Sequence, residues 1–431
     1  MRSSFCFLAI VIVYPIYGGL DVRGRELYVD GARFLARGVC YNPTPIGDDV
    51  NDDPPHGDYF SSGYAALHAR DLPYLRMMGI NVLRVYNWEP GVDHSGFLDA
   101  CYNNGQQPLL VLVNRWIDPG SDWSNAAVVA NVESQFVGMA REIKDHPAGL
   151  GVIIGNEVNE YNGNGLKPSF WRAMNRIAEA VKAEAPDLLV TMAITDRLQQ
   201  VAAFDAELTA LDAWSVQVYR GSRFGSFFSE YASASSKPLL ITEFGYDTYD
   251  NRAGNPYPDN GSYPADIVVG LIEESWENRD ICSGVFVFSY LDGLWKANGS
   301  DTEYDPGGNV NPGFEDGFAN EEWWGIFRPI ATPGQVDAVE PKALFEGLKE
   351  LWGQPQVLSL KLSENESQWH FDLERLPLRQ DEVARIEKWD EQSRSWVHFN
   401  RLEGSELSPG KRSLRFSIEK EAGLFRAVAL P

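Results

Sequence analysis

Eight short apolar runs that alternate with longer amphipathic segments are the feature that most constrains the fold of this chain. The runs are Phe34–Tyr41, Val82–Tyr86, Leu109–Val113, Gly151–Gly155, Leu188–Met192, Trp214–Val218, Leu239–Thr242 and Gly284–Phe288. In the intervening segments, apolar residues recur at three- and four-residue steps, as in Ala65–Met78, Ala126–Lys144, Lys167–Ala185 and Ala265–Asn278. Because strands that alternate with helices form parallel sheets, eight such units predict an α/β fold, a closed (β/α)8 TIM barrel over residues 20–354.

Two segments flank the predicted barrel at its N-terminal side. Leu27–Val29 and Arg33–Ala36 are joined by Asp30-Gly31, which suits a tight turn, so we expect a hairpin that plugs the bottom of the barrel. Before it, Arg2 and the apolar run Phe5–Tyr17 are typical of a signal peptide over residues 1–19. That run is shorter than the roughly 20 residues that a membrane span needs, so we expect cleavage and a secreted, extracellular or periplasmic protein.

The sequence changes character after Gly353-Gln-Pro355. Residues 355–431 alternate apolar and polar side chains between turn residues, which predicts a small β-sandwich-like domain. Its Trp389 and Trp396 suit the core of such a sandwich better than a glycan-binding face.

Charge and cysteine content exclude several classes of partner. A net charge of −24 argues against nucleic acid or an anionic membrane as partner, whereas a neutral polymer is compatible. Cys40, Cys101 and Cys282 remain once the leader is removed, and we expect small buried side chains rather than a disulfide. No spacing of His and Cys suits zinc, and the Asp-rich loops at 47–53 and 301–316 lack the EF-hand pattern, so neither metal nor cofactor is expected. We expect a monomer without a membrane span.

Two glutamates directly follow predicted strands. Glu157 lies just past Gly151–Gly155, and Glu243 just past Leu239–Thr242. Since the carboxyl ends of barrel strands converge on one mouth, we expect the two carboxyl groups to face each other across a substrate. Such a pair is the chemistry of glycoside cleavage, in which one carboxyl group donates a proton and the other attacks the anomeric carbon or activates water.

Polar neighbours at other strand ends support this pair. Asn156 is placed to bind a sugar hydroxyl beside the acid, while Arg84 lies in an apolar run and therefore needs an anionic partner. Tyr219 follows the sixth strand and is expected to donate its hydroxyl to Glu243. Glu160 is the rival carboxylate, but it lacks an adjacent strand and an asparagine partner.

Further polar and aromatic residues are expected at the mouth of the barrel, and about half of them to touch substrate. They are Asn42, Tyr86, Asn87, Asn114, Arg115, Tyr290 and Trp295. The long loop Leu291–Trp324 is expected to cover the mouth and to supply tryptophans as a sugar platform.

The sequence strings around these residues resemble a known group of enzymes. Asn156-Glu157 after a fourth strand resembles the acid/base motif of clan A retaining glycosidases, and Arg84 and Tyr219 resemble the residues that flank their nucleophile. The resemblance implies Glu157 as acid/base and Glu243 as nucleophile, with the two carboxyl groups about 5 to 5.5 Å apart as in a retaining enzyme. The strings Asp71–Leu75, Gly79–Tyr86, Gly155–Val158 and Thr242–Gly245 look most like the β-1,3-glucanosyltransferase family of fungal walls. They are also similar to glycoside hydrolase family 5 and to bacterial β-1,3-glucanases.

The resemblance implies a β-linked polysaccharide or oligosaccharide as substrate. We predict a retaining β-glycoside hydrolase, foremost an endo-β-1,3-glucanase. The alternatives are a β-1,3-glucan transglycosylase and a β-mannanase or other β-glucanase. A protein that binds glycan without cleaving it is the alternative from a different class, which the paired carboxylates argue against.

Overall fold

The computed structural model describes residues 19–353 except Asn298, together with the backbone of six strands between Ser359 and Leu430. Residues 1–18 of the predicted signal peptide lie outside the described residues, as do the side chains of Trp389 and Trp396.

Eight parallel strands form a closed barrel, in which β13 pairs with both β10 and β4 and so completes the circle. The strands are β4 (Ala36–Tyr41), β5 (Val82–Val85), β6 (Leu110–Arg115), β7 (Gly149–Asn156), β8 (Leu189–Thr195), β9 (Ala213–Gln217), β10 (Leu239–Phe244) and β13 (Cys282–Val287). Each overlaps one of the eight predicted runs, so the prediction of a TIM barrel is confirmed.

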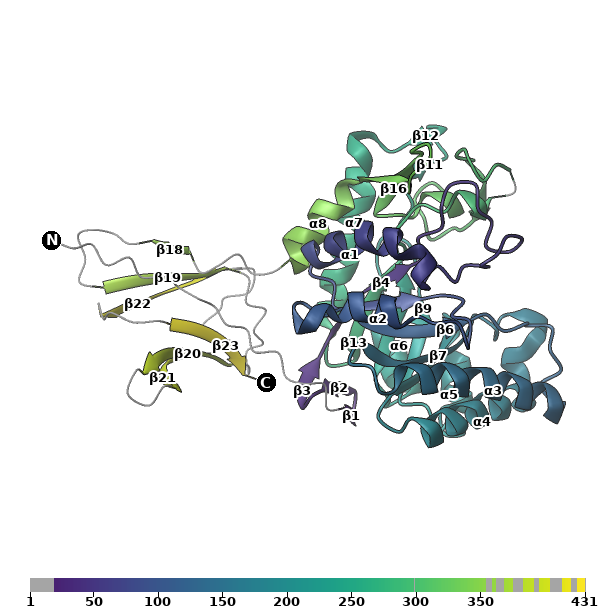
Figure 1. Cartoon of the computed structure of the whole chain (residues 1–431), viewed down its shortest axis with the longest axis horizontal. Helices are drawn as coiled ribbons and strands as arrows, with labels where there is room; N and C mark the ends of the chain where they lie inside the picture. Colours follow the sequence, from purple (N-terminus) through teal and green to yellow (C-terminus); the bar gives the residue numbers. More distant parts are fainter. Residues whose placement is uncertain are drawn as a thin grey trace. The chain divides into compact units, whose positions relative to one another are not determined.

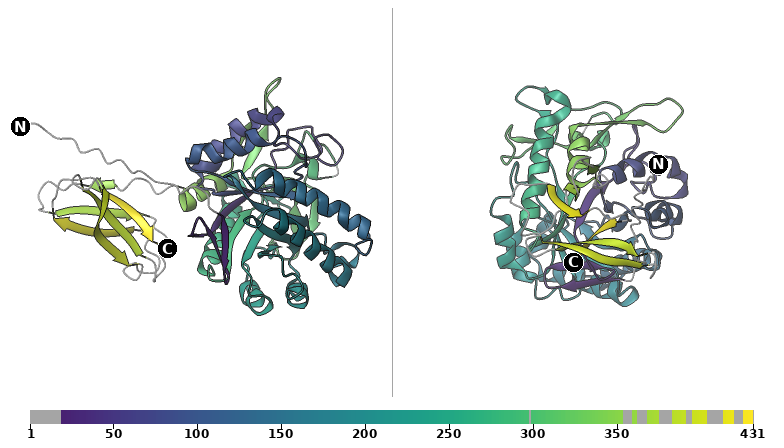
Figure 2. Two further views of the ribbon diagram at one scale, coloured as in Figure 1. Left: turned by 60° about the horizontal axis from the view of Figure 1, so that its bottom comes forward. Right: turned by 90° about the vertical axis from the view of Figure 1, so that its left-hand side faces the viewer.

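Helices surround the barrel (Figures 1 and 2). They are α1 (Ala65–Met77), α2 (Ser95–Tyr102), α3 (Ala126–Ile143), α4 (Pro168–Glu184), α5 (Leu198–Phe204), α6 (Phe227–Ala234), α7 (Pro258–Glu277) and α8 (Ala343–Trp352). Short 3-10 turns are η1 (Ser62–Tyr64), η2 (Asn103–Gly105), η3 (Tyr161–Leu166), η4 (Leu294–Lys296) and η5 (Glu321–Trp323). The main core lies between strands and helices, because the outward side chains of the strands are apolar and meet the apolar stripes of the helices.

A second, smaller core fills the inside of the barrel. It holds inward side chains such as Leu112, Ile153 and Leu240, and Leu27 joins it from below. Leu27 belongs to an antiparallel sheet of β1 (Leu20–Arg23), β2 (Glu26–Val29) and β3 (Ala32–Phe34). The predicted hairpin is therefore present, with one further strand, and its side chains pack against the barrel interior.

Short strand pairs elaborate the segments that follow β10 and β13. They are β11 (Tyr249–Asp250) with β12 (Asn255–Pro256), β14 (Gly308–Val310) with β15 (Phe318–Asn320), and β16 (Phe327–Ile330) with β17 (Ala338–Pro341). The last two pairs lie in the long segment after β13. This segment is anchored by a buried ion pair between Lys342 Nζ and Asp292 Oδ1 (2.7 Å). Asp292 also accepts hydrogen bonds from the Tyr304 hydroxyl (2.6 Å) and the Gly325 amide (2.7 Å), so both ends of the loop are fixed.

The chain divides into two compact units at Gly353. Beyond it, β18 (Ser359–Lys361), β19 (Gln368–Glu374) and β22 (Ser413–Glu419) form one three-stranded antiparallel sheet. The strands β20 (Val383–Asp390), β21 (Ser395–Glu403) and β23 (Phe425–Leu430) form another.

The three remaining cysteines are buried and form no disulfide in the described part of the chain. This confirms the prediction that Cys40 and Cys282 act as small buried side chains. Among the helices that the structure describes, none combines the length and apolar character needed to cross a bilayer. Within residues 19–353, apart from Asn298, no group of three or more His, Cys, Asp or Glu side chains is arranged to hold a metal ion.

His94 is a fully buried histidine that precedes α2 and contacts Glu142 on α3 and Asp58 in the segment before α1. Its Nδ1 contacts Glu142 Oε1 (2.6 Å), and its Nε2 contacts both carboxylate oxygens of Asp58 (3.1 Å). Burial lowers the pKa of His94, but the hydrogen bonds to Asp58 and Glu142 outweigh this effect and raise the pKa to about 9. The side chain is therefore an imidazolium at neutral pH that donates from both ring nitrogens.

We expect the His94 cluster to make stability depend on alkaline pH. A folded pKa of about 9, against about 6.5 in the unfolded chain, gives a contribution of about 3 kcal/mol. That contribution is present in full below pH 6.5 and is lost as the pH rises through 9. The difference in the free energy of unfolding between wild type and His94→Gln, measured by urea titration, should shrink from pH 6 to pH 9.5. Parallel pH curves for the two proteins would contradict this assignment.

Candidate active site

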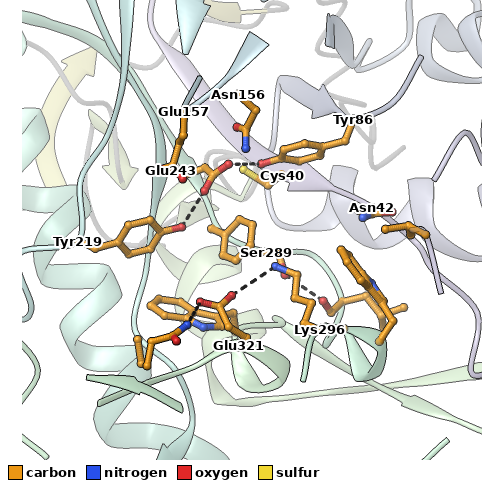
Figure 3. Close-up of a pocket in the computed structure, with 18 of the residues that line it drawn as sticks. Cys40, Asn42, Tyr86, Asn156, Glu157, Tyr219, Glu243, Ser289, Lys296 and Glu321 are labelled. Carbon is orange, nitrogen blue, oxygen red and sulfur yellow. Dashed lines mark hydrogen bonds and ion pairs between the residues drawn. The ribbon is translucent and has the colours of Figure 1, made fainter. Parts of the chain in front are cut away.

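Glu243 lies on β10, and its carboxylate accepts four hydrogen bonds. Oε1 accepts from Arg84 Nη1 (2.8 Å), the Tyr86 hydroxyl (2.6 Å) and Gln217 Nε2 (2.8 Å), and Oε2 accepts from the Tyr219 hydroxyl (2.9 Å). Figure 3 shows the two tyrosines reaching the carboxylate from opposite sides. A guanidinium and three neutral donors therefore hold this carboxylate in one orientation.

Arg84, fully buried on β5, connects the two halves of the site. Its Nη1 also donates to the Thr242 carbonyl (3.0 Å), and its Nη2 donates to Asn156 Oδ1 (2.5 Å). Gln217 Nε2 donates to the same Asn156 oxygen (2.6 Å). Since Oδ1 accepts both bonds, Asn156 turns its Nδ2 toward the pocket (Figure 3).

The end of β7 is bent so that Glu157 leaves the strand and faces the pocket. Gly155 and Glu157 both have a positive φ, 65° and 54°. A side chain at Gly155 would meet Val158 and Ile117 at 3.0 and 3.3 Å, which explains the glycine. A glutamate in the left-handed region is unusual and carries a modest strain, which is typical of residues held in place for function.

The two carboxyl groups have opposite environments although they share one pocket. Burial, followed by the negative charge of Glu243, raises the pKa of Glu157 to about 8. Among the residues that the structure describes, no cation donates a hydrogen bond to Glu157 as Arg84 does to Glu243. The geometry therefore gives the pair different roles, Glu157 as a proton donor and Glu243 as a carboxylate oriented by four donors, which is the division that glycoside cleavage needs.

The pocket has a volume of about 430 Å³ and lies at the carboxyl ends of the barrel strands. Its lining residues are Cys40, Asn42, Val50, Asn51, Tyr86, Asn87, Asn114, Trp116, Asn156, Glu157, Tyr219, Glu243, Phe288, Ser289, Leu291, Gly293, Trp295, Lys296, Asn309, Val310, Asn311, Ala319, Glu321 and Trp324. The structure thus brings Glu157, Glu243, Asn156, Tyr219, Tyr86, Asn42, Asn114 and Trp295 together, as expected from the sequence.

Asn114 and Tyr290 do something other than expected. Asn114 lines the pocket, but its Nδ2 donates to the carbonyls of Ile153 (2.9 Å) and Gly155 (2.7 Å), so it holds the end of β7 in place. Tyr290 does not line the pocket at all: it is fully buried, and its hydroxyl donates to Asp71 Oδ1 (2.6 Å). The expectation that Tyr290 contacts substrate is wrong, because Ser289 faces the pocket and the next side chain of an extended segment points away.

Neither of two other candidate groups competes with the pair. Glu160 is bound by Arg197 through Nε (2.9 Å) and Nη2 (2.5 Å), and these hydrogen bonds lower its pKa. Cys40 lines the pocket, but burial raises the pKa of its thiol to about 12, so it is not a nucleophile at neutral pH.

Several residues of the site were not predicted. Gln217 bonds Glu243 and Asn156, and a glutamine inside the apolar run Trp214–Val218 was the signal that a buried amide needed partners. Lys296 and Glu321 form a loose ion pair (3.8 Å) on the opposite wall, and Lys296 Nζ lies 4.0 Å from the ring centre of Phe288 (Figure 3). Both residues belong to the loop after β13, whose sequence has no helix or strand periodicity from which their positions could be predicted.

The raised pKa of Glu157 predicts the alkaline limit of activity. If Glu157 must be protonated to act, kcat/KM should fall as the pH rises through about 8, the pKa that burial and Glu243 give it. The residual activity of Glu157→Gln should lack this limb, because an amide does not titrate. The measurement is a pH–rate profile with a laminari-oligosaccharide, with circular dichroism at each pH to verify folding. A limb below pH 6, or an unchanged limb in the variant, would contradict the assignment.

Comparisons with known proteins agree with this architecture. A family profile described as glucanosyltransferase matches residues 16–188, a range that includes Arg84, Asn156 and Glu157. The 1,3-β-glucanosyltransferase gas1 of Schizosaccharomyces pombe is 25% identical over 254 residues, which cover 55% of this chain and 45% of that protein. The 1,3-β-glucanosyltransferase GAS5 of Saccharomyces cerevisiae is 31% identical over 250 residues, which cover 52% and 49%. In both cases the match spans about half of the relative's length.

Solved structures share the fold. Saccharomyces cerevisiae Gas2p in complex with laminaripentaose has a TM-score of 0.54 at 17% identity, over 78% of this chain and 68% of that one. A β-D-glucuronidase of Dictyoglomus thermophilum has a TM-score of 0.52 at 14% identity, over 78% and 53%. The resemblance to glycoside-modifying enzymes with a TIM barrel, and to the β-1,3-glucanosyltransferases above all, is confirmed.

Proposed function

We propose that this protein is a retaining enzyme that cleaves β-1,3-glucan and transfers the glycosyl group to a second glucan chain. The observation that carries the proposal is the opposite environment of Glu157 and Glu243 within one pocket. From the sequence we predicted hydrolysis, with transglycosylation as an alternative. The relatives are named glucanosyltransferases, which favours the alternative. The same site is compatible with both reactions, because either water or a sugar hydroxyl can attack in the second step.

In the first step, a carboxylate oxygen of Glu243 attacks the anomeric carbon while the bond from that carbon to the glycosidic oxygen breaks. Glu157 gives its proton to the departing oxygen, so the leaving chain departs as an alcohol. Arg84, Tyr86, Gln217 and Tyr219 orient the attacking carboxylate. The Nδ2 of Asn156 is available to the sugar beside it, where a bond to the 2-hydroxyl strengthens in the transition state.

In the second step, the ionised Glu157 takes the proton of an incoming hydroxyl, whose oxygen attacks the anomeric carbon and releases Glu243. The change of role follows from the causes of the raised pKa of Glu157. Once Glu243 is esterified its negative charge is gone, so the second-largest of the effects that raise the pKa of Glu157 disappears. Two inversions at the same carbon leave the β configuration unchanged.

The walls of the pocket suit a neutral sugar chain. Trp295 and Trp324 supply aromatic surface, on which the apolar face of a sugar can stack. The predicted signal peptide and a polymeric substrate support action outside the cell.

The test is to incubate the purified protein, beside Glu243→Gln, with laminarin, lichenan, barley β-glucan, mannan, cellulose and defined laminari-oligosaccharides, and to separate products by size. Products longer than the starting laminari-oligosaccharide, absent with the variant, are the expected result. Shorter products alone would move the proposal to an endo-β-1,3-glucanase, and cleavage of mannan alone to a β-mannanase. Binding to laminarin with no product from any polymer would favour the non-catalytic alternative.

A further inference from the structure

Trp116 is an exposed tryptophan at the edge of the pocket, just past the strand that pairs with the one preceding Glu157. Its side chain is 60% exposed although it lines the pocket. It directly follows β6, which pairs with β7. A large apolar ring left in water at the rim of a binding site marks a contact surface for a ligand.

The surroundings of Trp116 hold its backbone in place. On one side, Arg115 forms an ion pair with Glu89 and donates to Gln135 Oε1 (3.1 Å). On the other side, Ile117 is buried in the main core. Trp116 therefore stands on a fixed support.

The loop that begins with Trp116 is tied to the loop that follows Glu157. The Pro119 carbonyl accepts hydrogen bonds from Asn162 Nδ2 (3.1 Å) and Asn164 Nδ2 (2.9 Å), two residues of η3. A shift of one loop is thus transmitted to the other. The position of Trp116 relative to the acid is set by these bonds as well as by the pairing of β6 with β7.

The order of strands around the barrel assigns a side of the cleaved bond to each aromatic wall. Trp324 packs edge-on against Tyr219, with ring centres 5.1 Å apart, and Tyr219 donates its hydroxyl to Glu243, so Trp324 lies beside the nucleophile, where the sugar that is attacked must sit. Glu157 must reach the glycosidic oxygen, so the leaving chain extends on its side of that bond. Trp116 directly follows β6, the neighbour of β7, and Glu157 directly follows β7, so both lie on this side.

We infer that Trp116 is the stacking platform for the leaving chain in the first step and for the acceptor chain in the second. The leaving chain and the acceptor chain occupy the same subsites, because the second step is the reverse of the first with the hydroxyl of another chain as the attacking group. This inference rests on the proposed function and names the residue that recognises its second substrate. The ligand is a β-linked glucan chain whose apolar sugar face covers the indole ring.

The experiment compares two substrates that differ in the leaving group. Laminaripentaose loses a sugar chain that reaches Trp116, whereas β-laminaribiosyl fluoride loses a single fluoride ion. Trp116→Ala should lower kcat/KM for the pentaose relative to that for the fluoride by about tenfold, the equivalent of 1.4 kcal/mol of lost aromatic contact. With the fluoride as donor, the acceptor concentration that gives half-maximal transfer should rise by a similar factor. Trp116→Phe should restore most of both values.

Tyr161→Ala is the matched control, because Tyr161 is 54% exposed on the adjoining loop but does not line the pocket. It should leave the ratio between the two substrates unchanged. Equal losses on both substrates in Trp116→Ala, or the same change of ratio in Tyr161→Ala, would overturn the inference, since either points to a loosened loop rather than to a lost contact. A wild type inactive on both substrates would instead overturn the proposed function and, with it, this inference.

Discussion

Glu243→Ala is expected to lower kcat on laminari-oligosaccharides by about 10⁴-fold or more, the size of loss seen when a nucleophile is removed from an enzyme whose catalytic groups act together. The variant keeps Arg84, Tyr86 and Tyr219 but gives them no carboxylate to orient. It also leaves the buried Arg84 without its anionic partner, which costs stability as well as activity. The measurements are single-turnover kinetics and a thermal unfolding curve.

Added azide separates a lost nucleophile from a lost fold. The small anion enters the space left by the Glu243 side chain and attacks the anomeric carbon of a β-glycosyl fluoride directly. One displacement inverts the configuration, so the expected product is an α-glycosyl azide, identified by NMR. An unfolded variant would yield no azide product. A β-glycosyl azide would show that Glu243 is not the nucleophile.

Glu157→Ala is expected to lower kcat/KM on laminari-oligosaccharides by about 10³-fold, within the range for removal of a general acid. The loss on β-laminaribiosyl fluoride should be much smaller, because fluoride departs without a proton. Azide should then attack the glycosyl-enzyme formed on Glu243 and give a β-glycosyl azide, since two displacements retain configuration. The readouts are fluoride release and the configuration of the product.

Glu160→Ala is the matched control for Glu157→Ala. It removes a carboxylate three residues away that is hydrogen-bonded to Arg197 and does not line the pocket. Its activity on both substrates should stay within a few-fold of wild type. The assignment of Glu157 as the acid would be contradicted if Glu160→Ala lost as much activity as Glu157→Ala and with the same dependence on the leaving group.

The barrel and its carboxylate pair were predictable because both rest on local patterns. Each strand is a short run of buried apolar residues, and Glu157 and Glu243 stand where such runs end. The convergence of strand ends in a barrel then places the two groups together without knowledge of any loop. Arg84 was predictable for a related reason, since a guanidinium in an apolar strand requires a partner.

The rest of the site depends on features that the sequence does not encode locally. Lys296 and Glu321 form an ion pair although they are 25 positions apart, and the buried pair of Asp292 and Lys342 that shapes this loop joins residues 50 positions apart. The sequence does not distinguish Trp116 from other residues that follow a strand, because the exposure of its ring depends on the surrounding loops. Tyr290 was misplaced because its direction depends on the path of the chain beyond β13.

Trapping of the covalent intermediate tests the central claim most directly. In 2-deoxy-2-fluoro-β-laminaribiosyl fluoride, the fluorine at C2 destabilises the oxocarbenium-like transition states of both steps, while the good leaving group still allows the first step. We predict that the protein gains the mass of one fluorinated disaccharide and that peptide mapping places it on Glu243. A label on Glu157 or on another residue, or the absence of any label in a protein that turns over laminari-oligosaccharides, would contradict the account.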